Sequence, residues 1–267
     1  MNLKKLSDEM RAKIISLSNK AKTPHLASSL SCIDIIVSIY EKVLCFDLNK
    51  ENFKERDRFI LSKGHAATAL YTVLNYKGII TDSEIEGYAT KGSLLEEHPS
   101  PKLRGVEAAT GSLGHGLPIG CGISLAAKIL KKNYMTFILM SDGECNEGSV
   151  WEAALFAPSK KLSNLCAIVD FNQWQATGRS KEIMSLYPLK EKFRNFGWNV
   201  NEIDGHNHDE VVNACLAAKS QDNAPSIIIA NTVKGKGISF MEDDNNWHYR
   251  VPTDEEVKKC YIELGIK

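Results

Sequence analysis

Two polar clusters, thirty residues apart, carry the side chains that a phosphate and a divalent metal require. Asp142 and Gly143 lie just after the apolar run 135–140, and Asn172 lies just after the apolar run 165–169. Ligands of open α/β sheets bind at the carboxyl ends of parallel strands, and Asp and Asn oxygens suit Mg²⁺ or Ca²⁺. Asp-Gly and Asn-Gln are also common turn sequences, but two such clusters at this spacing favour a diphosphate and metal site.

Four of the seven histidines lie in segments that could present them to a ligand, namely His25, His65, His98 and His248. His65 follows an apolar stretch and Gly64 and precedes a predicted helix, a geometry that exposes a side chain and a helix N-terminus to an anion. His98 lies just before a glycine-rich loop. An ordinary surface or core role competes with each of these assignments, because single histidines are common in globular proteins.

The glycine-rich loop allows a second interpretation. Gly114, Gly116 and Gly120 fit a dinucleotide-binding pattern, which leaves a nicotinamide-dependent oxidoreductase open. That fingerprint must open directly from a buried strand, and the preceding residues contain no β-branched apolar run. Further along the chain, His206 and His208 are typical of a turn and a helix start, so we assign them structural roles.

Two acidic residues, Glu147 and Glu152, lie five positions apart at the start of a predicted helix. The helix dipole favours acids in the first turn, so simple charge complementarity explains them as well as a functional role does. The residues alone do not decide between the two.

The elements that must position these residues alternate between strands and helices. Short apolar runs predict strands over 58–61, 135–140, 165–170, 199–203 and 226–231. Helical spacing predicts helices over 1–22, 32–45, 66–76, 117–131, 150–158 and 209–219, with a short closing helix after Val251. The alternation predicts an α/β fold, a mainly parallel sheet covered by helices on both faces, in one domain over residues 1–267.

Composition argues against several classes of protein. Lysine plus arginine equals aspartate plus glutamate at 33 each, so neither a nucleic acid nor a membrane surface is expected as the main partner. Seven cysteines without a Cys-x-x-Cys pair indicate a reducing, cytoplasmic compartment rather than a disulfide framework or a zinc site. No apolar run approaches the roughly 20 residues of a membrane helix.

The segment Ser141-Asp142-Gly143-Glu144-Cys145-Asn146-Glu147-Gly148, with Asn172 downstream, resembles the thiamine-diphosphate motif of the transketolase family. The family motif usually begins Gly-Asp-Gly, and Ser141 replaces the first Gly here. The resemblance implies that a divalent metal, Mg²⁺ or Ca²⁺, is held by Asp142, Asn172 and the carbonyl of Trp174. It implies that thiamine diphosphate is contacted by His65, Gly111, Ser112, Leu113, Asp142, Gly143 and Asn172.

The resemblance also implies catalytic roles. His25, His98 and His248 match active-site histidines of the family. Glu147 and Glu152 match acids at the interface between two protomers, where they link the two cofactors.

The chain departs from the family pattern where the substrate would approach. Pro-Gly-Gly after His25 is replaced by Leu26, Ala27 and Ser28, and Glu97 replaces a Gly before His98. Leu94 falls where an Arg is common. The cofactor interpretation does not depend on these positions, whereas the identity of the sugar does.

The resemblance spans about residues 22–251 and corresponds only to the diphosphate-binding third of a full-length transketolase. It implies that the pyrimidine-binding and C-terminal domains, with the activating glutamate, are supplied by a partner chain in a two-plus-two heterotetramer. The implied function is a transferase that moves a two-carbon ketol unit from a ketose to an aldose. Alternatives are another thiamine-diphosphate carboligase acting on a modified or nucleotide-linked sugar, and an inactive regulatory half-copy.

Overall fold

A computed structural model describes residues 2–46 and 55–266 of the chain. All five strands are parallel and lie side by side in the order β1-β2-β3-β5-β4. Their bounds are β1 Arg58–Leu61, β2 Thr136–Ser141, β3 Leu165–Phe171, β4 Asn199–Asp204 and β5 Ser226–Asn231. Each predicted strand is present within one residue at either end, and the predicted α/β fold is confirmed.

The side chains of each strand point alternately to the two faces of the sheet, so buried apolar residues form a core on both faces. In β2, Phe137 and Leu139 join one cluster of buried apolar residues, while Ile138 and Met140 join the other. Successive side chains of a strand point to opposite faces, so a strand that is apolar throughout must be covered on both sides.

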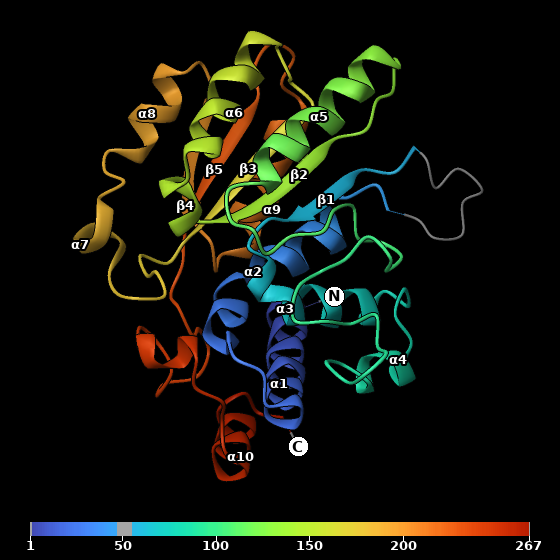
Figure 1. Ribbon diagram of the computed structural model, residues 1–267, viewed down its shortest axis with the longest axis vertical. Helices are drawn as coiled ribbons and strands as arrows, with labels where there is room; N and C mark the ends of the chain where they lie inside the picture. Colours follow the sequence, from blue (N-terminus) through green and yellow to red (C-terminus); the bar gives the residue numbers. More distant parts are fainter. Residues whose placement is uncertain (1, 47–54, 267) are drawn as a thin grey trace.

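Helices supply that cover. One face packs against α2 Leu26–Lys42 and α9 His208–Lys219, with α1 Leu3–Ala21 and α3 Ala67–Tyr76 packed on α2. The other face packs against α5 Gly116–Ile129, α6 Gly148–Ser159 and α8 Leu189–Asn195. Figure 1 shows α5 and α6 in front of the sheet and α1 and α10 below it. The remaining helices are α4 Asp82–Glu86, α7 Ser180–Met184 and α10 Asp254–Glu263.

The helix predictions differ from the structure mainly at α2, which begins six residues before the predicted start at Cys32. The added turns contain Ser28, Ser29 and Ser31, and the Ser31 hydroxyl lies 2.6 Å from Asp170 Oδ2 and 3.1 Å from the Ser28 carbonyl, so it is satisfied inside the helix. The short helices α4, α7 and α8 were not predicted, since each spans two turns or fewer. Met1, within the predicted first helix, lies outside the described residues.

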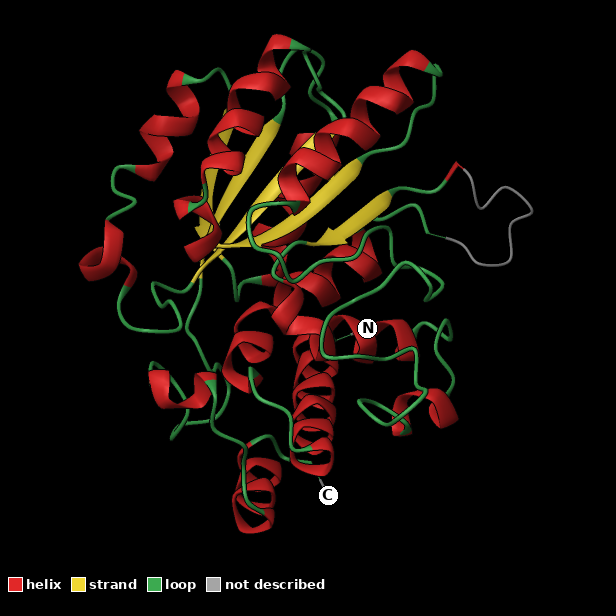
Figure 2. Ribbon diagram, in the orientation of Figure 1, coloured by secondary structure: helices red, strands yellow, loops and turns green. Residues whose placement is uncertain are grey.

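The carboxyl ends of the strands converge on the middle of the molecule, as the arrowheads in Figure 2 show. The segments that follow β1, β2, β3 and β5 therefore meet above the N-terminal ends of α2 and α3 and form the edge of the sheet where ligands bind in this class of fold. Within residues 2–46 and 55–266, no helix combines the length and apolar character needed to span a membrane.

Candidate active site

The Asp142 carboxyl group is buried directly after β2. Its two oxygens accept hydrogen bonds from the Gly143 N–H at 2.9 Å and from the Ser180 hydroxyl at 2.8 Å. Burial, reinforced by the nearby charge of Asp170, raises the pKa of Asp142 to about 6. A carboxylate that is desolvated in this way is stabilised by a cation beside it.

Asn172 follows the neighbouring strand β3, and the pairing of Ser141 with Asp170 brings Asp142 and Asn172 to the same edge of the sheet. Gln173 adopts a left-handed conformation (φ 65°), and the chain turns so that the Trp174 N–H donates to Asn172 Oδ1 at 3.0 Å. The amide of Asn172 and the carbonyl of Trp174 are thus held in one tight turn.

A divalent cation fits this donor set. Asp142, Asn172 and the Trp174 carbonyl offer oxygen atoms only, as Mg²⁺ prefers, and Mg²⁺ also keeps positions for phosphate oxygens and water. Among the described residues, no group of three or more His, Cys, Asp or Glu side chains is arranged to hold a metal by itself. A site with a single carboxylate therefore depends on the ligand's own oxygens to complete the shell.

An ion pair between Lys63 and Asp170 lies beneath these residues, and both side chains are fully buried. Burial alone would lower the pKa of Lys63, but the charge of Asp170 raises it above its usual value. Asp170 also accepts from Ser31 at 2.6 Å and from Thr232, and Lys63 donates to the Ser28 carbonyl at 2.9 Å. Sequence reasoning missed Lys63, although a lysine directly after an apolar strand was a usable signal.

The four histidines of the sequence motifs line a single cleft, together with Gly143 and Asn172. The ring centroid of His25 lies 5.4 Å from that of His65, 6.5 Å from that of His98 and 5.0 Å from that of His248. His25 adopts a left-handed conformation (φ 68°) directly before α2, and its N–H donates to the His248 carbonyl at 2.8 Å. The backbone thus joins the first and last histidines, which are more than two hundred residues apart.

Burial dominates the electrostatics of this cluster. It lowers the pKa of His25 to about 4, with His98 and Lys234 as further causes, and the pKa of His248 to about 3, with Lys234 next. The pKa of His65 is also lowered, by burial and then by Lys63. These three imidazoles are therefore neutral at pH 7, and each can donate one hydrogen bond and accept another.

Lys234, a second residue that sequence reasoning missed, reaches this cluster from the segment after β5. Its ammonium group lies 3.0 Å from His248 Nδ1 and donates to Asn245 Oδ1 at 2.6 Å. Burial, with the nearby charge of Lys63, lowers the pKa of Lys234 to about 8.

The glycine-rich loop approaches the cleft through Gly111 and Leu113. A Cβ atom at Gly111 would lie 2.6 Å from His98 Cδ2, and the residue has φ 127°, so only glycine fits here. Ser112 is exposed between them, and its hydroxyl contacts His115 at 3.3 Å, so the structure does not bring it to the cleft. Its predicted cofactor contact remains a prediction.

The loop is fixed by Glu144, whose buried carboxylate accepts from the Gly114 N–H at 3.0 Å, the Ser141 N–H at 2.9 Å and the Ser62 hydroxyl. One acid therefore joins the segments after β1 and β2 to the loop before α5. Because α5 follows this long loop and not a strand, the geometry of a dinucleotide fingerprint is missing from the described segment before Gly116.

Glu147 and Glu152, the two acids near the start of α6, lie in different places. Glu147 lines the cleft of the histidines, whereas Glu152 lines a different hollow between α5 and α6, beside Phe156. Both are exposed in this chain. Their predicted role between protomers remains a prediction.

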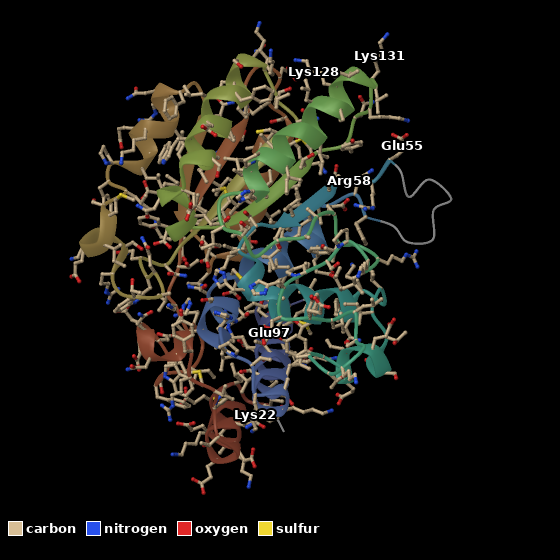
Figure 3. The ribbon with its side chains drawn as sticks, viewed as in Figure 1. Lys22, Glu55, Arg58, Glu97, Lys128 and Lys131 are labelled. Carbon is tan, nitrogen blue, oxygen red and sulfur yellow. The ribbon has the colours of Figure 1, made fainter. Side chains whose placement is uncertain are left out.

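The cleft as a whole has a volume of about 350 Å³. Its lining combines the cofactor-motif residues with the histidines and with Tyr249, which is 62% exposed. Figure 3 labels Glu97, the neighbour of His98, in the middle of the molecule, and labels Lys128 and Lys131 at the far end of α5. The cleft is therefore at the beginning of α5, where the strands end.

The positions of His206 and His208 predicted that they cap a turn and the start of a helix. The structure shows that neither histidine caps α9. The cap is Asn207, whose side chain accepts from the N–H groups of Asp209 and Glu210. The two histidine rings face the buried Asp34 of α2, with His206 Nδ1 at 2.7 Å from Asp34 Oδ2 and His208 Nε2 at 3.8 Å from Oδ1.

Comparisons with known proteins identify the family. Residues 3–267 match the family described as the transketolase thiamine diphosphate binding domain. The chain is 37% identical over 259 residues to one of the subunits of the apulose-4-phosphate transketolase of Phocaeicola vulgatus, covering 97% of this chain and 92% of that one. It is 38% identical over 241 residues to the 6-deoxy-6-sulfo-D-fructose transketolase subunit SqwG of Clostridium sp., covering 90% and 88% of the two chains.

The fold agrees with a transketolase from Campylobacter jejuni, with a TM-score of 0.92 and 27% identity over all of this chain. The match spans only 43% of the Campylobacter chain. A family match over almost the whole sequence, and the motif side chains gathered at one edge of the sheet, lead to the same conclusion: the chain belongs to the transketolase family, within its thiamine diphosphate-binding domain.

Proposed function

We propose that this chain is the thiamine-diphosphate-binding subunit of a two-chain transketolase that moves a two-carbon ketol unit from a ketose to an aldose. Relatives named as separate transketolase subunits are covered over 88% and 92% of their length, whereas the full-length Campylobacter transketolase is covered over 43%. The length of the match therefore favours a divided enzyme.

The observation that carries the proposal is that Asn172 and the four histidines line a single cleft, with Asp142 buried next to its Gly143 and Lys234 buried behind its His248. Asp142, Asn172 and the Trp174 carbonyl would hold Mg²⁺, and Ca²⁺ is the alternative ion. Gly143 lets the backbone approach a phosphate, and Lys234 supplies a positive charge close by. The exposed backbone of Gly111 and Leu113 suits the ring end of the cofactor.

When bound, thiamine diphosphate supplies the nucleophilic carbon that carries the two-carbon unit between the sugars. The chain's own residues bind and orient the sugar around it. Neutral His25 and His248 can donate hydrogen bonds to hydroxyl oxygens and to a carbonyl oxygen as negative charge develops on it. His98, which is half-buried and packed against Gly111, approaches the same space from the opposite side of the cleft.

The proposed complex contains two kinds of chain, each of which supplies different domains. In this proposal residues 1–267 form one domain, and a partner chain contributes the pyrimidine-binding domain. Two copies of each chain would pair through the surface around α6, which includes Glu147 at its start and Glu152, Leu155 and Phe156 further along, all exposed. A cytoplasmic location is part of the proposal and is supported by the seven free cysteine thiols.

A modified sugar as the substrate is favoured by the rim of the cleft. Tyr249 packs its ring 5.9 Å from that of His25 and 4.7 Å from that of His248, so a large aromatic surface borders the sugar space. Leu94, which falls where an Arg is common in the family, is 49% exposed in the hollow next to His98. An apolar side chain therefore replaces a positive charge at this position. Tyr249→Ala should therefore change the ratio of kcat/KM values between a modified ketose and fructose 6-phosphate. An unchanged ratio would remove Tyr249 from substrate selection.

The test of the proposed function is reconstitution with a pyrimidine-domain transketolase chain from the same organism. With thiamine diphosphate and Mg²⁺, the mixture should catalyse ketol transfer and sediment as a two-plus-two complex, while either chain alone should be inactive. Asn231→Ala, at the end of β5 and with its side chain bonded to Glu202, serves as a matched control for Asn172→Ala. Full activity of the isolated chain would contradict the divided enzyme, and an inactive complex that still binds the cofactor would identify a regulatory half-copy.

A further inference from the structure

The segment 233–237, which places Lys234 against His248 of the cleft, is held by residues outside the cleft. Gly235 and Gly237 both have left-handed conformations, with φ of 78° and 97°. Two glycines within three residues after Lys234 leave this backbone with little conformational preference of its own. Lys234 is nevertheless 1% exposed, and its ammonium group is directed at His248 and Asn245. Contacts with other elements must therefore fix the segment.

Those contacts begin at Asp34, a buried carboxylate of α2. It accepts hydrogen bonds from Arg11 of α1 and from His206 Nδ1, the latter at 2.7 Å. Burial by itself would raise the pKa of Asp34, but Arg11 and His206 together hold it well below its usual range. The carboxylate is thus ionised and joins a cation and an imidazole behind the cleft.

Both partners of Asp34 continue to the backbone of the lysine segment. Arg11 Nε donates to the Lys236 carbonyl at 2.9 Å, and the Val233 N–H donates to His206 Nε2 at 2.9 Å. A backbone N–H can only donate, so Nε2 carries no proton and the proton of His206 is on Nδ1, facing Asp34. Asp34 therefore selects the tautomer that lets His206 accept from Val233.

The packing is as close as the hydrogen bonding. A Cβ atom at Gly237 would lie 2.7 Å from Arg11 Cδ, and the Gly235 N–H donates to the Ala27 carbonyl at 3.0 Å. The segment is consequently bonded at Val233, Gly235 and Lys236, on both sides of Lys234.

We propose that Asp34, acting through Arg11 and His206, is a positioning residue that fixes segment 233–237 and thereby holds Lys234 against His248 of the cleft. The described residues that line the cleft include none of these three, and Lys234 itself reaches the cleft only through its contact with His248. The inference rests on the proposed function only in assuming that Lys234 faces the diphosphate of a cofactor. Two readouts, one of which needs no cofactor, separate the two ideas.

The experiment compares two substitutions of His206. His206→Gln can place an amide oxygen where Nε2 accepts from Val233, while His206→Asn can keep only a donor to Asp34. His208→Gln is the matched control, because His208 also faces Asp34 but bonds to Ser38 and not to segment 233–237. Inorganic diphosphate with Mg²⁺ is titrated calorimetrically into each protein, and the pH profile of Lys234 acetylation is followed by mass spectrometry.

We expect His206→Asn to weaken diphosphate binding by up to about tenfold, the effect of one lost hydrogen bond. The midpoint of Lys234 acetylation should move from about 8 toward the ordinary lysine value, because the ammonium group is no longer held in its buried position. His206→Gln should restore most of both properties, and His208→Gln should match the parent protein.

The proposal is overturned if His206→Asn and His206→Gln lower the melting temperature alike and leave the Lys234 midpoint unchanged, since His206 would then only support the fold. If His206→Asn fails to fold, Arg11→Lys tests the same link, because lysine keeps the charge beside Asp34 but loses the Nε bond to Lys236. A shifted midpoint in a protein that never binds diphosphate would support the positioning role and contradict the proposed function.

Discussion

The floor and the rim of the cleft are built on different principles. The floor consists of Lys63, Asp142, Asp170 and Asn172, all buried and bonded to one another or to neighbouring backbone groups. The rim consists of His25, His98 and Tyr249, which are half-buried or exposed. The structure records no hydrogen bond to their side chains from the described residues.

This difference separates binding from selection. Floor groups are already paired within the chain, so their positions are fixed before a ligand arrives, which suits a metal and a diphosphate of constant shape. Rim groups keep their hydrogen-bonding capacity free for a ligand, and a change there alters which sugar is accepted without disturbing the fold. The departures from the family pattern accordingly lie near the rim.

The largest effect should come from breaking the floor's ion pair. Lys63→Met leaves the Asp170 carboxylate buried without its cation, and the free energy of unfolding should fall by about 3–5 kcal/mol. Urea denaturation of the cofactor-free chain measures it. Lys131→Met, at the exposed end of α5, should change stability by less than about 0.5 kcal/mol. A loss below about 1 kcal/mol for Lys63→Met would mean that the floor is not held by this pair.

At the rim, His98→Ala should lower turnover of the reconstituted enzyme by about 10²- to 10³-fold, the usual effect of losing one transition-state donor. Affinity for thiamine diphosphate and the melting temperature should stay close to those of the parent protein. His115→Ala, which changes an exposed histidine within the glycine-rich loop, is the control. Near-normal turnover of His98→Ala would return His98 to an ordinary surface role.

Within the floor, Asp142→Ala or Asn172→Ala should weaken Mg²⁺-dependent thiamine diphosphate binding by about 100-fold or more, because each removes an oxygen ligand. Calorimetric titration after EDTA treatment, with and without added Mg²⁺, provides the measurement. The comparison sharpens if His98→Ala binds normally in the same assay. Equal affinities for the folded Asp142→Ala variant and the parent protein would remove the metal assignment.

The smallest effect concerns pH. The folded-state pKa values of His25 and His248, about 4 and about 3, lie below the 6.5 of an ordinary histidine. Between these values the unfolded chain binds more protons, so these residues contribute a loss of stability as the pH falls from about 6.5 to about 4 and none above it.

The comparison of His248→Asn with the parent protein isolates this contribution, because Asp142 and Glu144 titrate in both proteins. The unfolding free energy of the variant should fall less over this interval. The slopes of unfolding free energy against pH should differ by an amount that corresponds to at most about one bound proton. Denaturation at several pH values tests it, with His115→Asn as the exposed control. Parallel stability curves for His248→Asn and the parent protein would show that His248 is not buried as a neutral imidazole.

The sequence by itself determined the sheet and the family. Apolar runs such as 165–170 are local signals, and the Asp142 and Asn172 motifs follow directly from where two strands end. Strand ends of a parallel sheet meet at one edge, so the cofactor side of the site could be predicted without knowledge of any long-range contact. The same local logic failed at the start of α2, which begins six residues before the predicted Cys32.

Only the tertiary structure decided which distant side chains pair. Lys63 with Asp170, and His206 with Asp34 and Val233, are contacts between segments that share no pattern in the sequence. Their protonation states also depend on burial, which is a property of the packed molecule and not of any segment. The separation of Glu147 from Glu152 into different hollows has the same origin, because five helical positions turn the second acid to another face of α6.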